Sequence, residues 1–283
     1  MASLMQELRS RGVSPKRALG QHFLIDQGIA QKIVRLADLK PEDCVVEIGP
    51  GMGVLTFLML PLVKKVIAVE LDQGMADWLK EKAEGIPSLT IIRQDALGFD
   101  FAKASRDVGI KIKVVANLPY NISTPVIFRL LESRVFFSYL TLMLQREVAG
   151  RIIAVPGGKD YGPLAIFTQL YTSPKVMMRV PAEAFYPRPK VESALVRFEI
   201  LEHPRIEIDD DGFFQQVVRA SFAQRRKTLL NALTGSSLSL GPKDKVAAAL
   251  ESIGIDPRRR AETLDIVEFQ RLVEALKKDG NTG

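Results

Sequence analysis

Between residues 43 and 200, short apolar runs rich in β-branched side chains alternate with longer stretches in which apolar positions recur at helical spacing. Short continuous apolar runs are typical of strands buried on both faces, and the amphipathic stretches between them are typical of crossover helices. The pattern predicts an α/β domain with a mostly parallel, doubly wound sheet. The runs that we expect to form strands are residues 45–48, 66–70, 89–92, 113–116 and 139–144.

The alternation changes near the end of this region. Residues 175–180 and 191–200 have the composition of strands, but no long helical pattern separates them, so we expect an antiparallel, hairpin-like edge. Residues 203–212 then combine Pro, Gly and charge, as a domain boundary does. We therefore expect a first domain over residues 1–204 and a small all-α domain over residues 205–283.

Helical periodicity alone characterises the second domain. Pro242 suits the start of a helix, Gly254 suits the end of one, and Asp265 with Glu268 forms a capping pattern before the last helix. One helix is predicted to bury a single face, made of Phe214, Val217, Val218, Ser221 and Phe222.

The composition limits what this chain can be. Its 283 residues, 47% of them hydrophobic, suffice for one large and one small folded domain. Cys44 is the only cysteine, which excludes an intrachain disulfide and a multi-cysteine metal site and suits a reducing cytosol. Charge interrupts the N-terminus before a secretory apolar segment develops, and the apolar run at 54–63 is too short to span a bilayer. We expect a cytoplasmic protein without a metal or a membrane anchor.

The charge is moderately positive, with a formal value of +6 and a pI of about 9.4. Residues 1–35 contain six basic side chains against two acidic ones. Such an arm is either a solvated, flexible segment or a contact for a polyanion, and charge alone does not decide between them.

A glycine-rich turn follows the first predicted strand. Gly49, Gly51 and Gly53 are spaced G-x-G-x-G, and glycine lets the backbone approach a ligand at the carboxyl end of a sheet. The dinucleotide fingerprint needs its third glycine at position 54, where Val54 stands, and the Lys and Ser/Thr of a Walker A loop are missing. The turn therefore disfavours NAD, although a purely structural turn is an alternative.

Acidic residues follow the next two predicted strands. Glu70 ends the second strand, where a carboxylate can accept hydrogen bonds from both hydroxyls of a ribose. Asp95 follows the third strand, where a carboxylate can accept from an adenine amine. Each acid alone is a common surface residue, but the ordered series of turn, Glu70 and Asp95 predicts a nucleoside-containing cofactor.

The fourth predicted strand leads into Asn117-Leu118-Pro119-Tyr120. An amine conjugated to a purine is a poor nucleophile, so its hydrogens must be accepted and its nitrogen held in line with a sulfonium methyl. The Asn117 amide oxygen and the Leu118 carbonyl can accept them, and Pro119 restricts the backbone of Leu118. Tyr120 offers a ring on which a base can stack. No charged base is required, because the sulfonium leaves as a neutral thioether and the methylated amine can lose its proton to water.

Four further segments appear in order with this motif: residues 19–26, 47–53, 185–193 and 222–233. With them, nearly the whole chain between residues 15 and 272 resembles the KsgA-type rRNA adenine N6,N6-dimethyltransferases. The resemblance implies a Rossmann-like class I methyltransferase domain and the cofactor S-adenosyl-L-methionine. It also implies dimethylation of two adjacent adenosines in a hairpin near the 3′ end of 16S small-subunit rRNA, in a pre-30S or 30S particle.

Carried over residue by residue, the resemblance assigns roles to seven residues, which with Gly51, Leu118 and Tyr120 of the motifs above make ten expected site residues. Phe185 is expected to close on the target adenine opposite Tyr120, in an aromatic sandwich around an extruded nucleotide. His22 stands where many relatives carry Asn, and either can donate a hydrogen bond to the cofactor carboxylate. The expected base-site residues are Asn117, Leu118, Tyr120 and Phe185, and the expected cofactor residues are His22, Leu24, Gly49, Gly51, Glu70, Asp95 and again Asn117.

Basic residues of the second domain are candidates for phosphate contacts, namely Arg225, Arg226 and Lys227, with the run 258–260 as a further group. Two other functions stay open. A related enzyme class methylates large-subunit rRNA and confers macrolide resistance, typically with Ile where this chain has Leu118. A binding factor that matures the subunit without mainly catalysing is the other alternative. No coiled-coil heptad indicates a dimer, so a monomer is expected.

Overall fold

A computed structural model describes residues 15–16, 19–224 and 226–280 of the chain. The basic residues Arg9, Arg11 and Arg17 of the N-terminal arm and the candidate RNA-binding residue Arg225 lie outside the described residues. Contacts between residues divide the chain into two compact units. The first comprises residues up to 149 together with 173–200, and the second comprises residues 150–172 and those from 201 onward.

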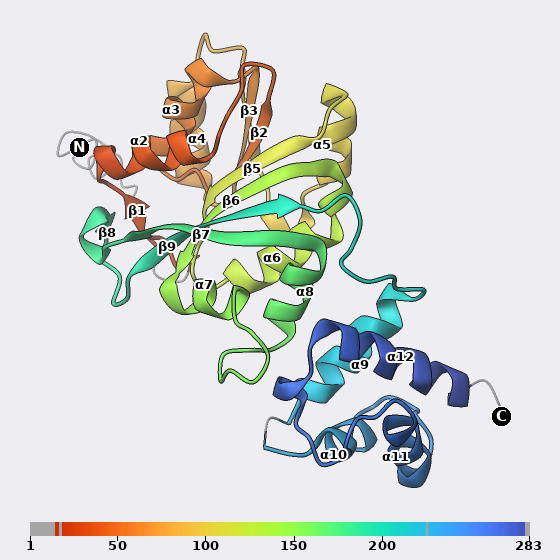
Figure 1. Ribbon diagram of the computed structural model, residues 1–283. Coiled ribbons are helices and arrows are strands. Elements are labelled where there is room, and N and C mark those ends of the chain that lie inside the picture. The colour runs from red at the N-terminus through yellow and green to blue at the C-terminus, as the bar shows by residue number, and fades with distance from the viewer. Residues whose placement is uncertain (1–14, 17–18, 225, 281–283) are drawn as a thin grey trace. The chain divides into compact units, whose positions relative to one another are not determined.

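A seven-stranded sheet, counted over the described residues, forms the centre of the first unit in the order β4-β3-β2-β5-β6-β9-β7 (Figure 1). The pairs β2–β3, β3–β4, β2–β5 and β5–β6 are parallel, whereas β9 runs antiparallel to β6. The predicted mostly parallel α/β fold with two strands at its far edge is thereby confirmed. The strands are β2 (Cys44–Ile48), β3 (Lys65–Glu70), β4 (Leu89–Arg93), β5 (Ile112–Asn117), β6 (Phe137–Gln145), β7 (Thr172–Val180) and β9 (Ser193–Ile200).

Helices cover both faces of this sheet. All five residues of β2 are buried although successive side chains point to opposite faces. One face packs against α2 (Gln27–Leu36) and α3 (Val54–Met59), whose apolar residues share a core cluster with Val45, Val66 and Leu195. The other helices that connect the strands are α4 (Gln73–Lys82), α5 (Phe101–Val108), α6 (Ser123–Glu132) and α7 (Arg146–Ile152).

Aspartates begin several of these helices. Asp26 accepts from the Ile29 amide at the start of α2, and Asp72 accepts from the Met75 amide at the start of α4. A side-chain acceptor at this position satisfies a backbone N–H that has no partner within the helix. Both helices therefore start next to residues that the sequence predicts to bind the cofactor.

A separate two-stranded sheet joins distant parts of the first unit. In it β1 (Phe23–Leu24) pairs antiparallel with β8 (Phe185–Tyr186), with Phe23 opposite Tyr186 and Leu24 opposite Phe185. The segment before α2 is thus held against the segment that precedes β9.

The second unit is helical. Aromatic contacts join α8 (Pro163–Tyr171) to α9 (Asp211–Phe222), and the Phe167 and Phe214 rings lie 6.3 Å apart. The predicted capping box is confirmed, because Asp265 accepts from the Glu268 amide at 2.7 Å and Glu268 accepts from the Asp265 amide at 3.0 Å. The remaining helices are α10 (Leu229–Thr234), α11 (Lys243–Ser252) and α12 (Ile266–Gly280).

Candidate functional site

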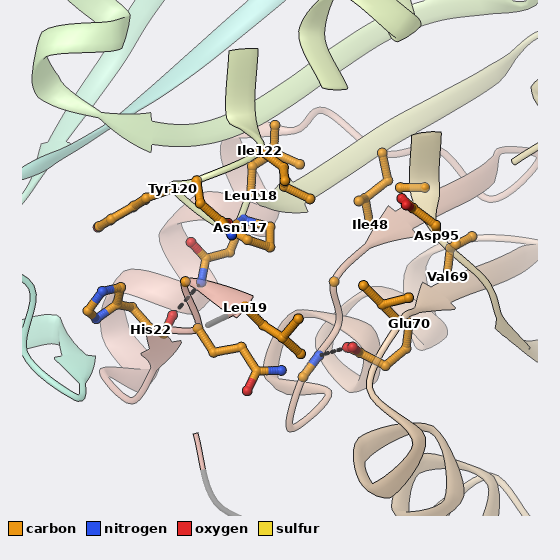
Figure 2. A pocket seen from close by; sticks show the side chains of 18 of the residues that line it. Leu19, His22, Ile48, Val69, Glu70, Asp95, Asn117, Leu118, Tyr120 and Ile122 are labelled. Atoms are coloured by element: carbon orange, nitrogen blue, oxygen red, sulfur yellow. Dashed lines mark hydrogen bonds between the residues drawn. The ribbon is translucent and has the colours of Figure 1, made fainter. Parts of the chain in front are cut away.

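A cavity of about 750 Å³, which includes the open solvent at its mouth, lies at the carboxyl ends of β2, β3, β4 and β5. Residues 19–23 of the N-terminal segment complete its wall. Figure 2 shows Glu70 and Asp95 at one end of the cavity, Tyr120 and His22 at the other, and Asn117 between them. Eight of the ten predicted site residues line it: His22, Gly49, Gly51, Glu70, Asp95, Asn117, Leu118 and Tyr120.

The glycine turn after β2 needs glycine for two reasons. Gly49, Gly51 and Gly53 all have positive φ angles, which strain any residue with a Cβ atom. A Cβ atom on Gly51 would also lie 2.8 Å from the Phe23 ring. The turn can therefore pack closely on Phe23 while Gly49 and Gly51 line the cavity.

Glu70 is fixed by the main chain around it. Its two carboxylate oxygens accept from the Gly51 amide at 3.1 Å and from the Asp72 amide at 2.8 Å. Burial raises the pKa of Glu70, although hydrogen bonds from these amides act in the opposite direction. The carboxyl group thereby links the glycine turn to the end of β3.

Asp95 lies across from Glu70 and is exposed. One of its oxygens accepts from the Leu97 amide at 2.9 Å, which orients the carboxylate where β4 has ended. Two acidic side chains at the ends of adjacent strands thus stand at one end of the cavity, where carboxylates can accept hydrogen bonds from the hydroxyls and the base of a nucleoside.

Asn117 is oriented by the arm. Its side-chain nitrogen donates to the main-chain oxygen of His22 at 2.9 Å. Because the amide nitrogen makes this hydrogen bond, the amide oxygen of Asn117 remains to accept a hydrogen bond from another donor. The last residue of β5 is therefore prepared to accept a hydrogen bond at the middle of the cavity.

Tyr120 and His22 form the other end of the cavity. Their rings are stacked, with centroids 5.0 Å apart and planes inclined by 30°. The His22 Nδ1 donates to the Pro187 carbonyl at 2.6 Å. In the neutral ring this leaves Nε2 as an acceptor, so donation from Nε2 to a carboxylate requires the protonated ring.

A second contact holds the arm near the cofactor end. Lys16 makes an ion pair with Asp72, with Nζ and Oδ2 2.6 Å apart, and the main-chain amide of Lys16 donates to the Gln21 side chain at 2.8 Å. Asp72 is also the residue that caps α4 and donates its amide to Glu70. The arm is therefore attached at both ends of the cavity.

Comparison with known proteins identifies this arrangement. A model of the family "Ribosomal RNA adenine dimethylase" matches residues 12–278. The chain belongs to this family. The expected resemblance and the class I methyltransferase fold are thereby confirmed, and the protein is an rRNA adenine dimethyltransferase.

Individual relatives agree over nearly the full length of this dimethylase. It is 44% identical to the ribosomal RNA small subunit methyltransferase A of Pelotomaculum thermopropionicum, over 99% of this chain and 97% of that protein. It is 46% identical to the protein of the same name from Geobacillus kaustophilus, over 95% and 93% of the two chains.

Solved structures of dimethylases and related enzymes share the architecture. A dimethyladenosine transferase from Plasmodium falciparum is 30% identical, with a TM-score of 0.75 over 92% of this chain and 98% of that one. The 23S rRNA methyltransferase ErmE is 25% identical, with a TM-score of 0.64 over 90% and 99% of the two chains.

Leu24 and Phe185 are not among the residues that line the main cavity. They lie opposite each other in the β1–β8 pair, are 4% and 2% exposed, and belong to one core cluster. Leu24 borders a smaller adjacent cavity together with Gly49 and Asn117. Stacking of the Phe185 ring on a base would require that ring to leave the core.

Sequence reasoning missed two buried polar residues beside the site. Ser193 begins β9 and is bonded to the Tyr120 hydroxyl, with the oxygens 2.6 Å apart. Glu47 lies in β2 and accepts from the Thr56 hydroxyl at 2.5 Å. A carboxylate inside an otherwise apolar strand was a signal for Glu47, because acids are rarely fully buried. Ser193 gave no such signal.

Among the residues that the structure describes, no cluster of three or more His, Cys, Asp or Glu side chains is placed to hold a metal ion. Within the same residues, no helix has both the length and the apolar character needed to cross a membrane.

Proposed function

We propose that this dimethylase transfers methyl groups from S-adenosyl-L-methionine to the N6 amines of two adjacent adenosines in a hairpin near the 3′ end of 16S rRNA. It acts as a monomer in the cytoplasm, on a pre-30S or 30S particle, and so contributes to small-subunit biogenesis. The 44–46% identity to full-length proteins named ribosomal RNA small subunit methyltransferase A supports this substrate.

The orientation of Asn117 is the observation that carries the proposed chemistry. With its nitrogen bonded to the His22 main chain, its oxygen can accept a hydrogen from an adenine amine. Accepting that hydrogen keeps the nitrogen lone pair directed at the methyl donor and excludes rotation of the amine. Leu118, which also lines the cavity, supplies a second acceptor through its carbonyl.

The other end of the cavity fits S-adenosyl-L-methionine. Glu70 would hold the ribose and Asp95 the adenine, while Gly49 and Gly51 would border the methionine end beside His22. Leu24 would contact it only from the adjacent smaller cavity, which it shares with Gly49 and Asn117. Bound there, the cofactor supplies an electrophilic methyl group. The position of the turn supports this fit, because Gly49 and Gly51 line the same cavity as Glu70 and Asp95.

Tyr120 provides the surface for the target base. An adenine must leave its helix before the N6 amine can reach a pocket, and stacking on an aromatic ring offsets part of the lost base stacking. Tyr120 is half-buried and lines the cavity next to Asn117. We include Phe185 as a second stacking residue only for a state in which its ring has left the core.

Large-subunit methylation is the second candidate, and the likeness to ErmE favours it. The 44–46% identity to proteins named ribosomal RNA small subunit methyltransferase A, and Leu118 in place of Ile, favour the small subunit. A third candidate is a maturation factor that mainly binds the ribosomal subunit. Variants of Asn117 test it, because they should impair methylation without abolishing subunit binding.

Methyl transfer to isolated subunits tests the proposal. Labelled S-adenosyl-L-methionine is incubated with the protein and with unmethylated small or large subunits, and labelled nucleosides are mapped. We expect four methyl groups on two adjacent adenosines of the small subunit. Label confined to large subunits would overturn the substrate assignment.

Asn117→Ala tests the catalytic assignment in the same assay. Loss of a preorganised acceptor should lower kcat by about 100-fold while particle binding is retained. Asn231→Ala, which makes the same change at an exposed position of the helical unit, is the matched control. Unaltered methylation by Asn117→Ala would refute the role of this residue.

A further inference from the structure

The Tyr120 hydroxyl is hydrogen-bonded to a buried serine. Its oxygen lies 2.6 Å from Oγ of Ser193, which is 0% exposed and 73 residues further along the chain. Burying a hydroxyl without a partner is unfavourable, and the contact satisfies both groups at once. The tyrosine is therefore attached to β9 as well as to its own loop.

The sheet topology places Ser193 at this position. Because β9 runs antiparallel to β6, its first residue lies at the edge where the parallel strands end, opposite Gln145. Asn117 ends β5 at the same edge, next to β6. The antiparallel direction of β9 thus brings a residue from late in the chain to the target-base end of the cavity.

Two contacts together define the plane of the Tyr120 ring. The phenolic oxygen lies on the axis about which the ring turns, so its bond to Ser193 fixes the direction of that axis but not the rotation. The stacked His22 ring restricts the rotation, and its own bond to Pro187 holds it in place. A stacking surface needs both the axis direction and the rotation of the ring to be fixed, because a stacked base lies parallel to the ring beneath it.

We propose that Ser193 is a positioning residue for methyl transfer, whose hydroxyl fixes the axis of the Tyr120 ring and, together with the stacked His22 ring, sets the plane that holds the target adenine in line with the methyl donor. This inference rests on the proposed role of Tyr120. A phenylalanine would stack as well as a tyrosine, so the hydroxyl is explained by its partner. Burial raises the pKa of Tyr120, which keeps the hydroxyl protonated and the bond intact across neutral pH.

The experiment removes the Ser193 hydroxyl, the Tyr120 hydroxyl, and then both hydroxyls together. Ser193→Ala and Tyr120→Phe delete the same hydrogen bond from opposite sides, and methyl transfer is measured on whichever ribosomal subunit the wild-type protein methylates. We expect each variant to lose about tenfold in kcat, and the double variant to lose no more than the larger single loss. The Kd for S-adenosyl-L-methionine, measured by calorimetry, should stay within twofold, because Glu70 and Asp95 lie at the other end of the cavity.

Controls separate positioning from folding. Thr141→Val removes another buried hydroxyl, from β6 of the same sheet, and should leave kcat unchanged. Ser193→Thr retains the hydroxyl and should recover activity relative to Ser193→Ala. If Ser193→Ala does not fold, Tyr120→Phe alone decides, since it leaves the ring and its packing in place.

Two results would overturn the inference: wild-type kcat in a folded Ser193→Ala or Tyr120→Phe variant, or losses that multiply in the double variant. A wild-type protein that methylates neither subunit would instead contradict the proposed function. The two failures are therefore distinguishable.

Discussion

Glu47 is a carboxylic acid inside the sheet, two residues before the glycine turn. Burial raises its pKa to about 8, although the hydrogen bond from Thr56 lowers it, and the charge of Glu70 raises it further. At neutral pH the group is therefore mostly protonated. It supports the base of the turn as a neutral hydrogen-bonding residue, which avoids a second charge beside Glu70.

Glu47→Gln should reduce the pH dependence of stability. In the unfolded chain this carboxyl ionises near its ordinary value of 4.5, but in the folded protein near 8. Between these values the folded state holds a proton that the unfolded state has released, so the free energy of unfolding falls as pH rises. The contribution reaches at most about 1.4 kcal/mol per pH unit.

Urea unfolding at pH 6 and pH 8 measures this difference. The wild-type protein should lose more stability between the two values than Glu47→Gln, whereas the exposed control Glu84→Gln should behave as the wild type. Equal losses in wild type and Glu47→Gln would show that the acid is not protonated in the fold.

At the scale of single residues, the sequence predicts groups whose position follows from a motif. Glu70 and Asn117 each end a strand, and carboxyl ends of parallel strands meet at one edge, so both could be placed in the cavity beforehand. The bond between Tyr120 and Ser193 could not, because it joins residues 73 positions apart and depends on the direction of β9. The burial of Phe185 depends likewise on its pairing with Leu24.

The turn between β2 and α3 is the element whose conformation most constrains the cofactor end. Gly51→Ala should raise the Kd for S-adenosyl-L-methionine at least tenfold, because its Cβ atom would displace the Phe23 ring that lines the cavity. Gly85→Ala is a matched control, since Gly85 also has a positive φ, of +79°, but nothing lies within 4 Å of an added Cβ atom.

Gly85→Ala should lose about 1 kcal/mol of stability through backbone strain, and Gly51→Ala should lose more because it also displaces Phe23. Only Gly51→Ala should lose cofactor affinity. Calorimetric titration and urea unfolding measure the two quantities separately. Equal cofactor affinity in the two variants would show that the collision with Phe23 is unimportant.

A helix or strand could be predicted from the sequence where several of its residues share the same pattern. The short apolar runs located every parallel strand, and the Asp265–Glu268 pair located the start of α12. The strands β1 and β8 have two residues each, too few for any periodicity, so their pairing emerges only from the folded chain. That pairing holds the arm which orients Asn117.

At the scale of the molecule, the contact-defined second unit includes residues 150–172, which the sequence analysis assigned to the first domain. The α8 helix is strongly apolar and could belong to either core by composition. Its aromatic contacts with α9, through Phe167 and Phe214, decide which core it joins. Contacts between segments so far apart in the chain produce no local sequence pattern, so the sequence alone could not predict them.

The helical unit also carries the proposed rRNA contacts. Arg226 and Lys227 are exposed, whereas Arg258 and Arg259 are engaged with Asp256 and Glu268. We expect Arg226→Glu combined with Lys227→Glu to weaken binding to small subunits at least tenfold and to reduce its salt dependence. The affinity for S-adenosyl-L-methionine should not change.

Lys243→Glu combined with Lys245→Glu makes the same change of charge on α11 and is the matched control. Filter binding at several salt concentrations compares the two pairs. Equal weakening by both would indicate a general charge effect instead of a local contact.

The long-range attachment of the two stacked rings has a consequence for protein synthesis. The partners of His22 and Tyr120 are Pro187 and Ser193, which the ribosome adds after every strand of the parallel sheet. Domains begin to fold while the chain is still being made, from the N-terminus onward. A nascent copy shorter than 193 residues can form the nucleoside end of its cavity but lacks the anchors of the ring platform. The ring platform is therefore the last part of the site to be completed as the chain is made.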